Sequence, residues 1–316
     1  MKVAALAGGV GAGKFLRGLV RVVPGEDVTA IVNTGDDIAV HGLHVAPDVD
    51  SVTYWLAGVA DRDRGWGREG ETFRATEELR GMKAEGAWFG LGDLDLATHL
   101  FRTPRLAAGD PLSVATDLLR RRFGVAARIL PMSDDPVTTR VDAVDDNGAM
   151  LDLHFQEYWV LRGARDEVKA VRYMGAERAA PAPGVLDALA EADAVLICPS
   201  NPVASIGPIL AVPGVREAVA ARRSRVAGVS PIVGGAPLRG MADRLLPAVG
   251  VEVSAAGVAG HYAGLVGGWA IDEVDRELAP RIEAMGIRVR VTDTIMSDDE
   301  AAGSVARAAL DLALAG

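Results

Sequence analysis

The sequence predicts an α/β fold with a doubly wound, Rossmann-like and mostly parallel sheet, a helical insertion and a β-hairpin segment. Short apolar runs between turn residues recur near both ends of the chain, which is typical of parallel strands buried on both faces. Helical patterns separate these runs, and such alternation favours a doubly wound sheet. A glycine-rich turn over 8–13 directly follows the first run, as in the first strand-to-helix connection of such sheets.

The elements of the predicted sheet follow in order along the chain. Strands are expected at 2–7, 28–32, 194–198, 225–230 and 287–292, where apolar and β-branched residues lie between turn residues. Helices are expected at 184–192, 215–223 and 299–314. The capping signal Ser297-Asp298-Asp299-Glu300 marks the start of the last helix.

The middle of the chain has a different pattern. Residues from about 51 to 123 show helical periodicity and many charges, so we expect helices inserted beside the sheet. Two alternating runs, 138–144 and 150–161, flank an Asn-Gly turn and predict a hairpin. We therefore expect one compact unit over 1–316. Its core is 1–50 and 181–316, its helical insert 51–125 and its β-rich segment 126–180.

Composition restricts the class of protein. With 33 basic and 43 acidic residues the net charge is −10, which repels nucleic-acid backbones, so no nucleic-acid partner is expected. No apolar run reaches the roughly 18 residues that span a bilayer, and the first strand lacks the basic start of a signal peptide. We therefore expect no membrane association and a cytoplasmic location. The single cysteine, Cys198, excludes an internal disulfide and ends an apolar run as a buried thiol.

The glycine-rich turn predicts a phosphate site. Residues 7–15 read Ala-Gly-Gly-Val-Gly-Ala-Gly-Lys-Phe, and backbone N–H groups at such a helix start bind anions. Gly8, Gly13 and Lys14 have P-loop spacing, but Phe15 stands where a Ser or Thr would hold magnesium. Lys14 also takes the third glycine position of the dinucleotide fingerprint. The turn therefore disfavours an ordinary NTPase and an NAD-dependent dehydrogenase.

Acidic residues follow the second predicted strand. The run Asn33-Thr34-Gly35-Asp36-Asp37 should meet the glycine turn over the crevice, because both loops lie at the carboxyl ends of strands. Asp48 and Asp50 come soon after, and in an extended segment their carboxylates would point the same way. Carboxylates beside substrate phosphates are how proteins hold Mg²⁺, so we expect magnesium here. The alternative is that these aspartates cap helices and turns.

Later polar turns offer further donors. The turns at 92–95, 199–205 and 230–235 follow apolar runs and present hydroxyl, amide and backbone groups to a nucleotide, or serve only as turns. His99 and His261 have no partner at metal-ligand spacing and are expected to be surface or hydrogen-bonded imidazoles. Trp66 and Trp88 lie in a polar region where a flat ring could stack.

These motifs, in this order, closely resemble the 2-phospho-L-lactate transferase family over nearly the whole chain. Each motif alone is a weak signal, but together and in register they are highly specific. The matching segments are 7–15, 33–37, 47–50, 64–67, 88–93, 95–99, 131–136, 155–156, 199–208 and 230–232.

The resemblance implies transfer of a phospho-carboxylate from its guanosine diphosphate ester to the ribityl hydroxyl of the deazaflavin precursor Fo. The products would be GMP and the glutamate-free F-420-type coenzyme, and the acid would be 2-phospholactate, phosphoenolpyruvate or 3-phosphoglycerate. It also implies Mg²⁺ and a homodimer, in which the glycine-rich apolar stretch 257–271 could form the interface. A P-loop-like nucleotide hydrolase or kinase and a non-catalytic guanosine nucleotide sensor remain alternatives.

The resemblance also implies roles for individual residues. Asp36 and Asp48 would be metal ligands, with Asp37 as the alternative ligand. Asp50 and Asp37 would be catalytic residues, with Asp50 orienting or deprotonating the acceptor hydroxyl. Asp50, Asp93 and Trp88 would bind the deazaflavin. The donor and its phosphates would be bound by Gly8, Gly9, Val10, Gly11, Gly13, Lys14, Asn33, Thr34, Ser200, Asn201 and Ser205.

Two positions depart from the family pattern. Many members carry a Lys at the position of Gly90 and a basic residue at that of Leu94, so two positive charges near the acceptor are missing. A nearby arginine such as Arg64 or Arg68 could replace the lost partner of Asp93.

Overall fold

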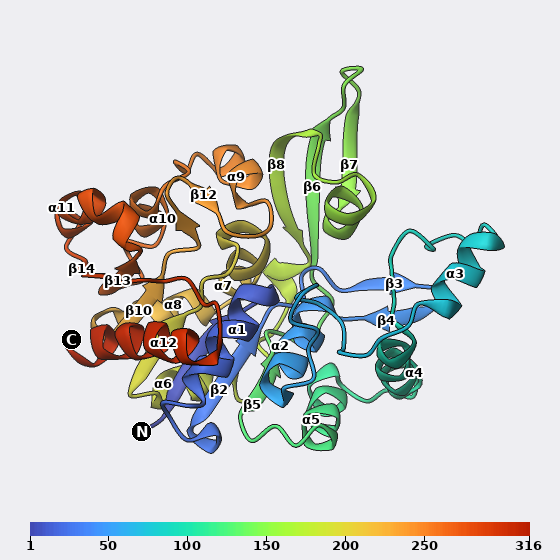
Figure 1. Ribbon diagram of the computed structural model, residues 1–316, viewed down its shortest axis with the longest axis horizontal. Helices are drawn as coiled ribbons and strands as arrows, with labels where there is room; N and C mark the ends of the chain where they lie inside the picture. The colour runs from blue at the N-terminus through green and yellow to red at the C-terminus, as the bar shows by residue number, and fades with distance from the viewer.

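The computed structural model describes all 316 residues, and a seven-stranded parallel sheet lies at its centre (Figure 1). The strand order is β14-β13-β10-β9-β1-β2-β5, so the order reverses between β1 and β9. This confirms the doubly wound, Rossmann-like fold. The strands are β1 (Val3–Ala7), β2 (Val28–Val32), β5 (Arg128–Pro131), β9 (Ala194–Ile197), β10 (Val226–Val229), β13 (Gly268–Ile271) and β14 (Arg288–Val291).

Strand periodicity divides the interior into two cores. Successive side chains of a strand point to opposite faces, so Val3 and Ala5 of β1 pack in one core and Ala4 and Leu6 in the other. The first core is covered by α1 (Gly9–Leu19), α2 (Pro47–Ala57) and α12 (Asp299–Leu314). The second is covered mainly by α6 (Val185–Glu191), α7 (Gly207–Ala211), α8 (Val215–Ala220), α9 (Ala242–Leu245), α10 (Ala255–His261) and α11 (Ala279–Glu283).

The helices expected in the middle of the chain form beside the β2–β5 edge of the sheet. They are α2, α3 (Arg74–Gly81), α4 (Asp93–Ala107) and α5 (Leu112–Arg122). A short hairpin, β3 (Ile38–Val40) and β4 (Leu43–Val45), extends towards α3 and α4 (Figure 1). It carries the chain from the acidic run after β2 to the start of α2.

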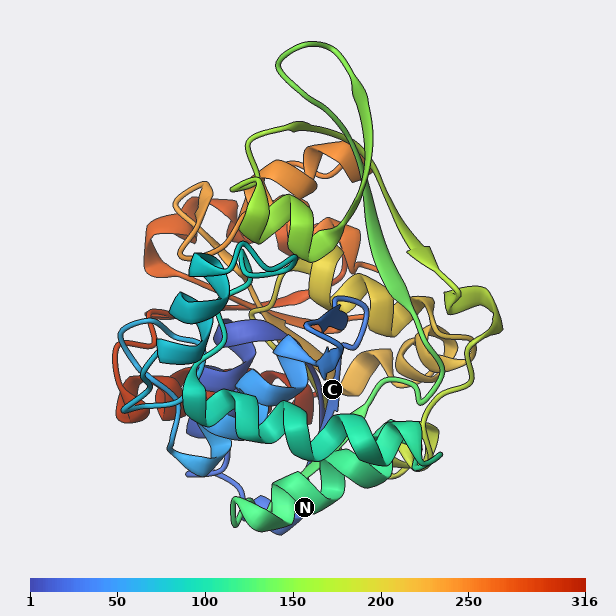
Figure 2. The same cartoon turned by 90° about the vertical axis from the view of Figure 1, so that its right-hand side faces the viewer.

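The predicted hairpin forms as an antiparallel pair within a three-stranded sheet that projects from the body (Figure 2). Its strands are β6 (Thr138–Val144), β7 (Met150–His154) and β8 (Glu167–Met174). The second strand was predicted too long, because the chain turns at Phe155 and forms a π-helical turn over Glu157–Leu161. A further short hairpin pairs β11 (Ile232–Val233) with β12 (Ala236–Pro237).

Three other predictions are corrected. The segment 47–50 is the first turn of a helix, not extended chain, because Pro47 at the helix start and the acidic first turn favour a helix N-terminus. Residues 126–180 were predicted as a β-rich segment outside the core, but strand β5 from this segment forms one edge of the central sheet. The stretch 257–271 is largely buried within the chain, with Val258 and Trp269 fully covered, so these side chains cannot form a dimer interface. No helix is both long and apolar enough to cross a membrane.

Candidate active site

A cavity of about 930 Å³ lies at the carboxyl ends of β1 and β9, where the strand order reverses. Open α/β sheets bind ligands at this point because neighbouring loops separate there. Its walls come from the starts of α1 and α2, the turn after β9, the segment 237–242 and the loop 294–297. The glycine turn, the acidic residues and the later polar turns therefore meet in one place.

Close packing explains the glycines of the turn. Gly8 is the only residue between β1 and α1, and its N–H donates to Ser200 Oγ at 3.2 Å. A Cβ on Gly8 would collide with the carboxylate of Asp48, and one on Gly11 with the carbonyl oxygen of Pro199. Gly9 has a φ of +70°, in the left-handed region that favours glycine. The glycines therefore let the start of α1 pack against α2 and the turn after β9 and still line the cavity with its backbone.

Most of the predicted donor residues line this cavity, but three do not. Gly13 lies against the indole of Trp55, where its missing side chain lets α1 approach α2. Asn33 and Thr34 are buried behind the cavity wall. The residues that do line it are Gly8, Gly9, Val10, Gly11, Lys14, Ser200, Asn201 and Ser205.

Asn33 joins the two predicted metal ligands. Its Nδ2 donates to Asp36 Oδ1 at 3.0 Å and to Asp48 Oδ2 at 2.8 Å. Gln156 Nε2 donates to the other oxygen of Asp36 at 2.8 Å. Both carboxylates are buried and face the cavity. The amide groups thus fix two acidic side chains next to Gly8 and Gly9.

Burial gives this pair an unusual charge state. Burial raises the pKa of Asp36 well above its usual range, and repulsion from Asp48 and Asp37 reinforces the shift. Burial raises the pKa of Asp48 to about 7, although the hydrogen bond from Asn33 opposes the shift. Nearby basic side chains pair instead with Asp37 and Asp50. Two such carboxylates without a basic partner fit a divalent cation.

Asp37 lies apart from this pair. Its Oδ2 is 2.9 Å from His44 Nε2, and its side chain, which is 10% exposed, is not part of the cavity wall. Burial raises the pKa of Asp37, while the neighbouring His44 opposes the shift. The structure therefore places Asp37 where it can influence the charges of Asp36 and Arg102 but not touch a ligand in the cavity.

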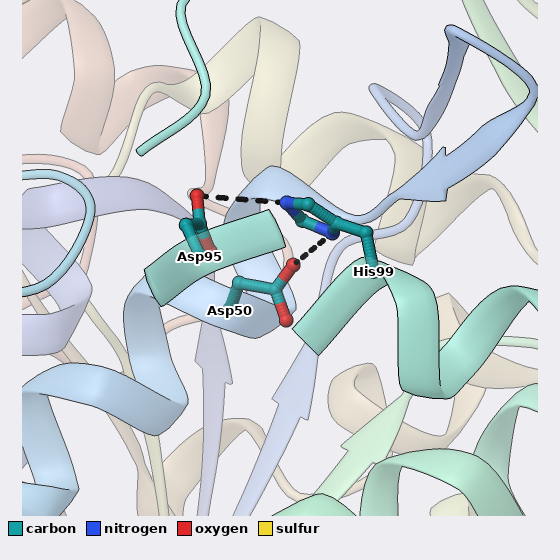
Figure 3. Close-up of side chains that lie close together, drawn as sticks. All are labelled: Asp50, Asp95 and His99. Carbon is teal, nitrogen blue, oxygen red and sulfur yellow. Dashed lines mark ion pairs between the residues drawn. The ribbon is translucent and has the colours of Figure 1, made fainter. Parts of the chain in front are cut away.

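Asp50 belongs to a second buried network, formed with α4. Arg102 donates to both oxygens of Asp50, with Nη1 at 3.0 Å from Oδ2, and the guanidinium is fully buried. His99 lies between two carboxylates, with Nδ1 3.7 Å from Asp50 and Nε2 3.5 Å from Asp95 (Figure 3). Tyr54 donates its hydroxyl hydrogen to Asp95 at 2.6 Å.

Asp50, Asp95 and His99 have the spacing of a possible metal site, because their ligand atoms lie within 4.8 Å of one another. Arg102 already neutralises Asp50, however, and its Nη1 lies 3.4 Å from His99 Nδ1. A cation at this place would face a fixed positive charge. Of the two places, the charges around the Asp36–Asp48 pair are the better match for a divalent cation.

The two other predicted deazaflavin residues lie outside the cavity wall. Asp93 accepts from the backbone N–H of Ala75 at 3.1 Å and from the Thr72 hydroxyl, so it holds the start of α3. Trp88 packs edge-on against Phe89, with ring centroids 5.6 Å apart. Large apolar side chains nearby do line the cavity: Trp66, Phe89, Trp159 and Val160.

No arginine replaces the positive charges that many family members carry at the positions of Gly90 and Leu94 as a partner for Asp93. Arg64 pairs with Asp61 at 2.8 Å, and Arg68 donates to the Leu94 carbonyl at 3.2 Å, so neither forms an ion pair with Asp93. Hydrogen bonding, chiefly from Thr72, lowers the pKa of Asp93 instead.

Sequence reasoning missed several residues of the site. Arg102, Tyr54 and Asp95 had no assigned role, and His99 was expected to be unremarkable. The signal was present, because Asp95 and His99 are four residues apart and therefore share one face of a helix. The Arg102–Asp50 contact joins residues far apart in the sequence and has no local signal.

Comparisons with known proteins show the family of this chain. The family model described as "2-phospho-L-lactate transferase CofD" matches residues 3–299. Proteins named phosphoenolpyruvate transferase from Streptomyces griseus and Streptomyces avermitilis are 52% and 54% identical over 314 residues, which cover 99% of this chain and 98% of each relative.

A solved structure supports the fold. A member of the UPF0052 family from Bacillus halodurans aligns with a TM-score of 0.62 at 17% identity and covers 98% of this chain and 98% of its own. At this identity the likeness concerns the fold alone. The family match and the full-length relatives settle the classification. The chain belongs to the 2-phospho-L-lactate transferase family and is a transferase of that type.

Proposed function

We propose that this enzyme transfers a phosphoenolpyruvyl group from its guanosine diphosphate ester to the ribityl hydroxyl of Fo, giving GMP and a glutamate-free F-420-type coenzyme. The choice of acid rests on the full-length relatives, which share about half of their residues with this chain and are named phosphoenolpyruvate transferases. The observation that carries the chemistry is the Asp36–Asp48 pair beside the open start of α1, because displacement at a diphosphate depends on positioning and charge neutralisation.

The donor diphosphate would lie at the start of α1. Gly8, Gly9 and Gly11 bring the backbone at the start of α1 to the cavity, and the helix dipole there favours an anion. Ser200, Ser205 and Asn201 line the same cavity from the turn after β9, and Asn201 would contact the guanosine. These groups hold the diphosphate and leave its outer phosphorus open to attack.

Asp36 and Asp48 would hold Mg²⁺, since they are buried, face the cavity and lack a basic partner. When bound, Mg²⁺ neutralises charge that develops on the diphosphate oxygens. Asn33 and Gln156 set the orientation of the two carboxylates. Asp37 acts from behind the wall through its charge.

The acceptor would enter along the apolar wall formed by Trp66, Phe89 and Trp159. Asp50 orients the ribityl hydroxyl and accepts its proton while Arg102 keeps the carboxylate in place. The hydroxyl oxygen forms a bond to the outer phosphorus, the bridging P–O bond breaks, and GMP leaves with the bonding electrons. Trp88 and Asp93 support this wall from outside.

The alternatives predict different chemistry. A P-loop-like hydrolase or kinase needs a Ser or Thr hydroxyl for magnesium at the position of Phe15. The Phe15 side chain is instead fully buried in the core beneath α1. A nucleotide sensor would bind guanosine phosphates without turnover. The homodimer and the cytoplasmic location stay predictions.

Incubation of the protein with Fo, Mg²⁺ and each of the three guanylylated acids tests the proposal, with the deazaflavin product analysed by mass spectrometry. The expected result is a mass gain of one phosphoenolpyruvyl group and little product from the other two donors. A preference for phospholactate or phosphoglycerate would overturn the choice of acid but keep the transferase. No transfer from any donor would overturn the reaction.

A further inference from the structure

Two positively charged side chains line the cavity without a carboxylate partner. Lys14 of α1 forms no ion pair or hydrogen bond, and its Nζ lies 5.7 Å from the ring centroid of Trp55. Arg239, between β12 and α9, forms no ion pair, and its one hydrogen bond is to the Asp63 carbonyl at 3.4 Å. In contrast, the third cation of the wall, Arg62, pairs with Asp299 at 3.1 Å.

The two side chains approach one another over the first turns of α1. Arg239 packs over Gly65, and the side chain of Val10 meets the same point. Val10 and Lys14 are four residues apart and lie on one face of α1. Trp55 joins the group by donating from Nε1 to the Gly65 carbonyl at 3.1 Å.

This arrangement is electrostatically unfavourable when the cavity is empty. Burial lowers the pKa of Lys14, and the charges of Arg239 and Arg62 lower it further. The chain carries a net charge of −10, so free acidic partners are abundant elsewhere. Like charges that gather without a counter-ion at a cavity wall indicate an anionic ligand.

The anion is separate from the diphosphate in the proposed function. Asp48, which Asn33 links to Asp36, lies beside Gly8 and Gly9, whereas Arg239 lies over Gly65 next to Val10, and Lys14 follows Val10 by one turn of α1. The diphosphate already has the open start of α1 and the proposed cation to neutralise it. The remaining negative group of the donor is the carboxylate of its acid moiety.

We propose that Lys14 and Arg239 form the subsite that binds the donor carboxylate. Arginine offers a planar pair of donors that matches a carboxylate, and lysine adds a point charge. The subsite selects esters of acids over esters of neutral alcohols. It does not distinguish the three candidate acids, since all carry the carboxylate. The inference rests on the proposed function, whose donor it describes further.

Arg239→Gln and Lys14→Gln variants test the subsite with two donors: the guanylylated acid and the same compound with its carboxylate converted to a carboxamide. Each variant should lose about 10- to 100-fold in kcat/KM on the acid, the range for a hydrogen bond to a charged group, and under about threefold on the carboxamide. Inhibition by GDP should be nearly unchanged. Arg244→Gln, which changes an exposed arginine of α9 outside the cavity, is the matched control.

Equal losses on both donors, or weaker inhibition by GDP, would show that these side chains bind the diphosphate and would overturn the proposal. Calorimetric binding of the acid and the carboxamide keeps the test independent of turnover. If the protein transfers nothing, the proposed function fails. In the binding measurement, the unmodified protein should prefer the acid over the carboxamide, and loss of this preference in Arg239→Gln would still support the subsite. Equal binding of the acid and the carboxamide by the unmodified protein would overturn it.

Discussion

Asp48 and Asp50 stand two residues apart in the first turn of α2, yet their carboxylates have different partners. Asp48 accepts a hydrogen bond from Asn33 at 2.8 Å, and Asp50 is held by Arg102 of α4. Residues two apart on a helix point in widely different directions, so one turn supplies two sites. The donor side with its proposed cation and the acceptor side thus have a fixed separation.

Without metal, the Asp48 carboxylate should make stability fall as pH rises. The folded chain holds a proton on Asp48 up to pH of about 7, whereas the unfolded chain loses it near the ordinary value of 3.8. The contribution of Asp48 to the free energy of unfolding therefore falls between these values and is level above them. Thermal unfolding in EDTA should show this slope, and Asp48→Asn should make it shallower, with the remaining fall due to Asp36, whose pKa is also raised.

Mg²⁺ should reverse this loss. At pH 8 it should raise the melting temperature of the unmodified protein, because it binds the folded state. The same titration at pH 5.5 should give a smaller rise, since protons compete for the carboxylates. An equal rise in Asp48→Asn would exclude Asp48 as a ligand.

Removing Arg102 should destabilise the protein. Arg102→Met leaves Asp50 buried without its partner, which costs about 3–5 kcal/mol in comparable pairs. Urea denaturation followed by circular dichroism measures the change. Arg105→Met, which breaks a partly exposed pair with Asp110, should cost about 1 kcal/mol or less. Similar costs for both variants would contradict the account of the buried network.

Asp50→Asn should lose catalysis more than donor binding. The amide keeps a hydrogen bond to Arg102 but cannot accept the acceptor proton, so kcat should fall about 100-fold or more. Inhibition by GDP should stay close to that of the unmodified protein. Steady-state kinetics with varied Fo gives both quantities. Unchanged turnover would remove Asp50 from the mechanism.

Gly11→Ala should disturb the junction of α1 with the turn after β9. The added methyl would collide with the Pro199 carbonyl, so about 1–3 kcal/mol of stability should be lost, together with GDP binding. Gly81→Ala at the end of α3 meets no atom within 4 Å and should be neutral or slightly stabilising. Comparable melting temperatures for the two variants would be inconsistent with this packing.

The sequence predicted the parallel core well because its buried strands and capped helices carry local signals. The 28–32 strand and the 299–314 helix have the predicted bounds, and Asp298 caps α12 as expected. Strand β13 was missed, because Gly268 and Trp269 do not give a clear strand pattern. This segment is a strand because it pairs with β10 on one side and β14 on the other.

Within the site, sequence spacing found groups near a phosphate but not their pairing. The acidic run was predicted to be extended, but a helix begins at Pro47. The side chains of Asp48 and Asp50 therefore point in different directions. Arg102 and Gln156 reach these carboxylates from distant segments, so no local pattern reveals them. Trp88 and Phe89 are adjacent in sequence, and only the fold decides which of the two faces the cavity.

The most direct test of the central claim is to measure GMP release from the guanylylated acid in the presence and absence of Fo. The account predicts one GMP for each deazaflavin product and negligible release without Fo, because Asp50 acts on the acceptor hydroxyl. Release of GMP at the same rate without Fo would identify a hydrolase and contradict the account.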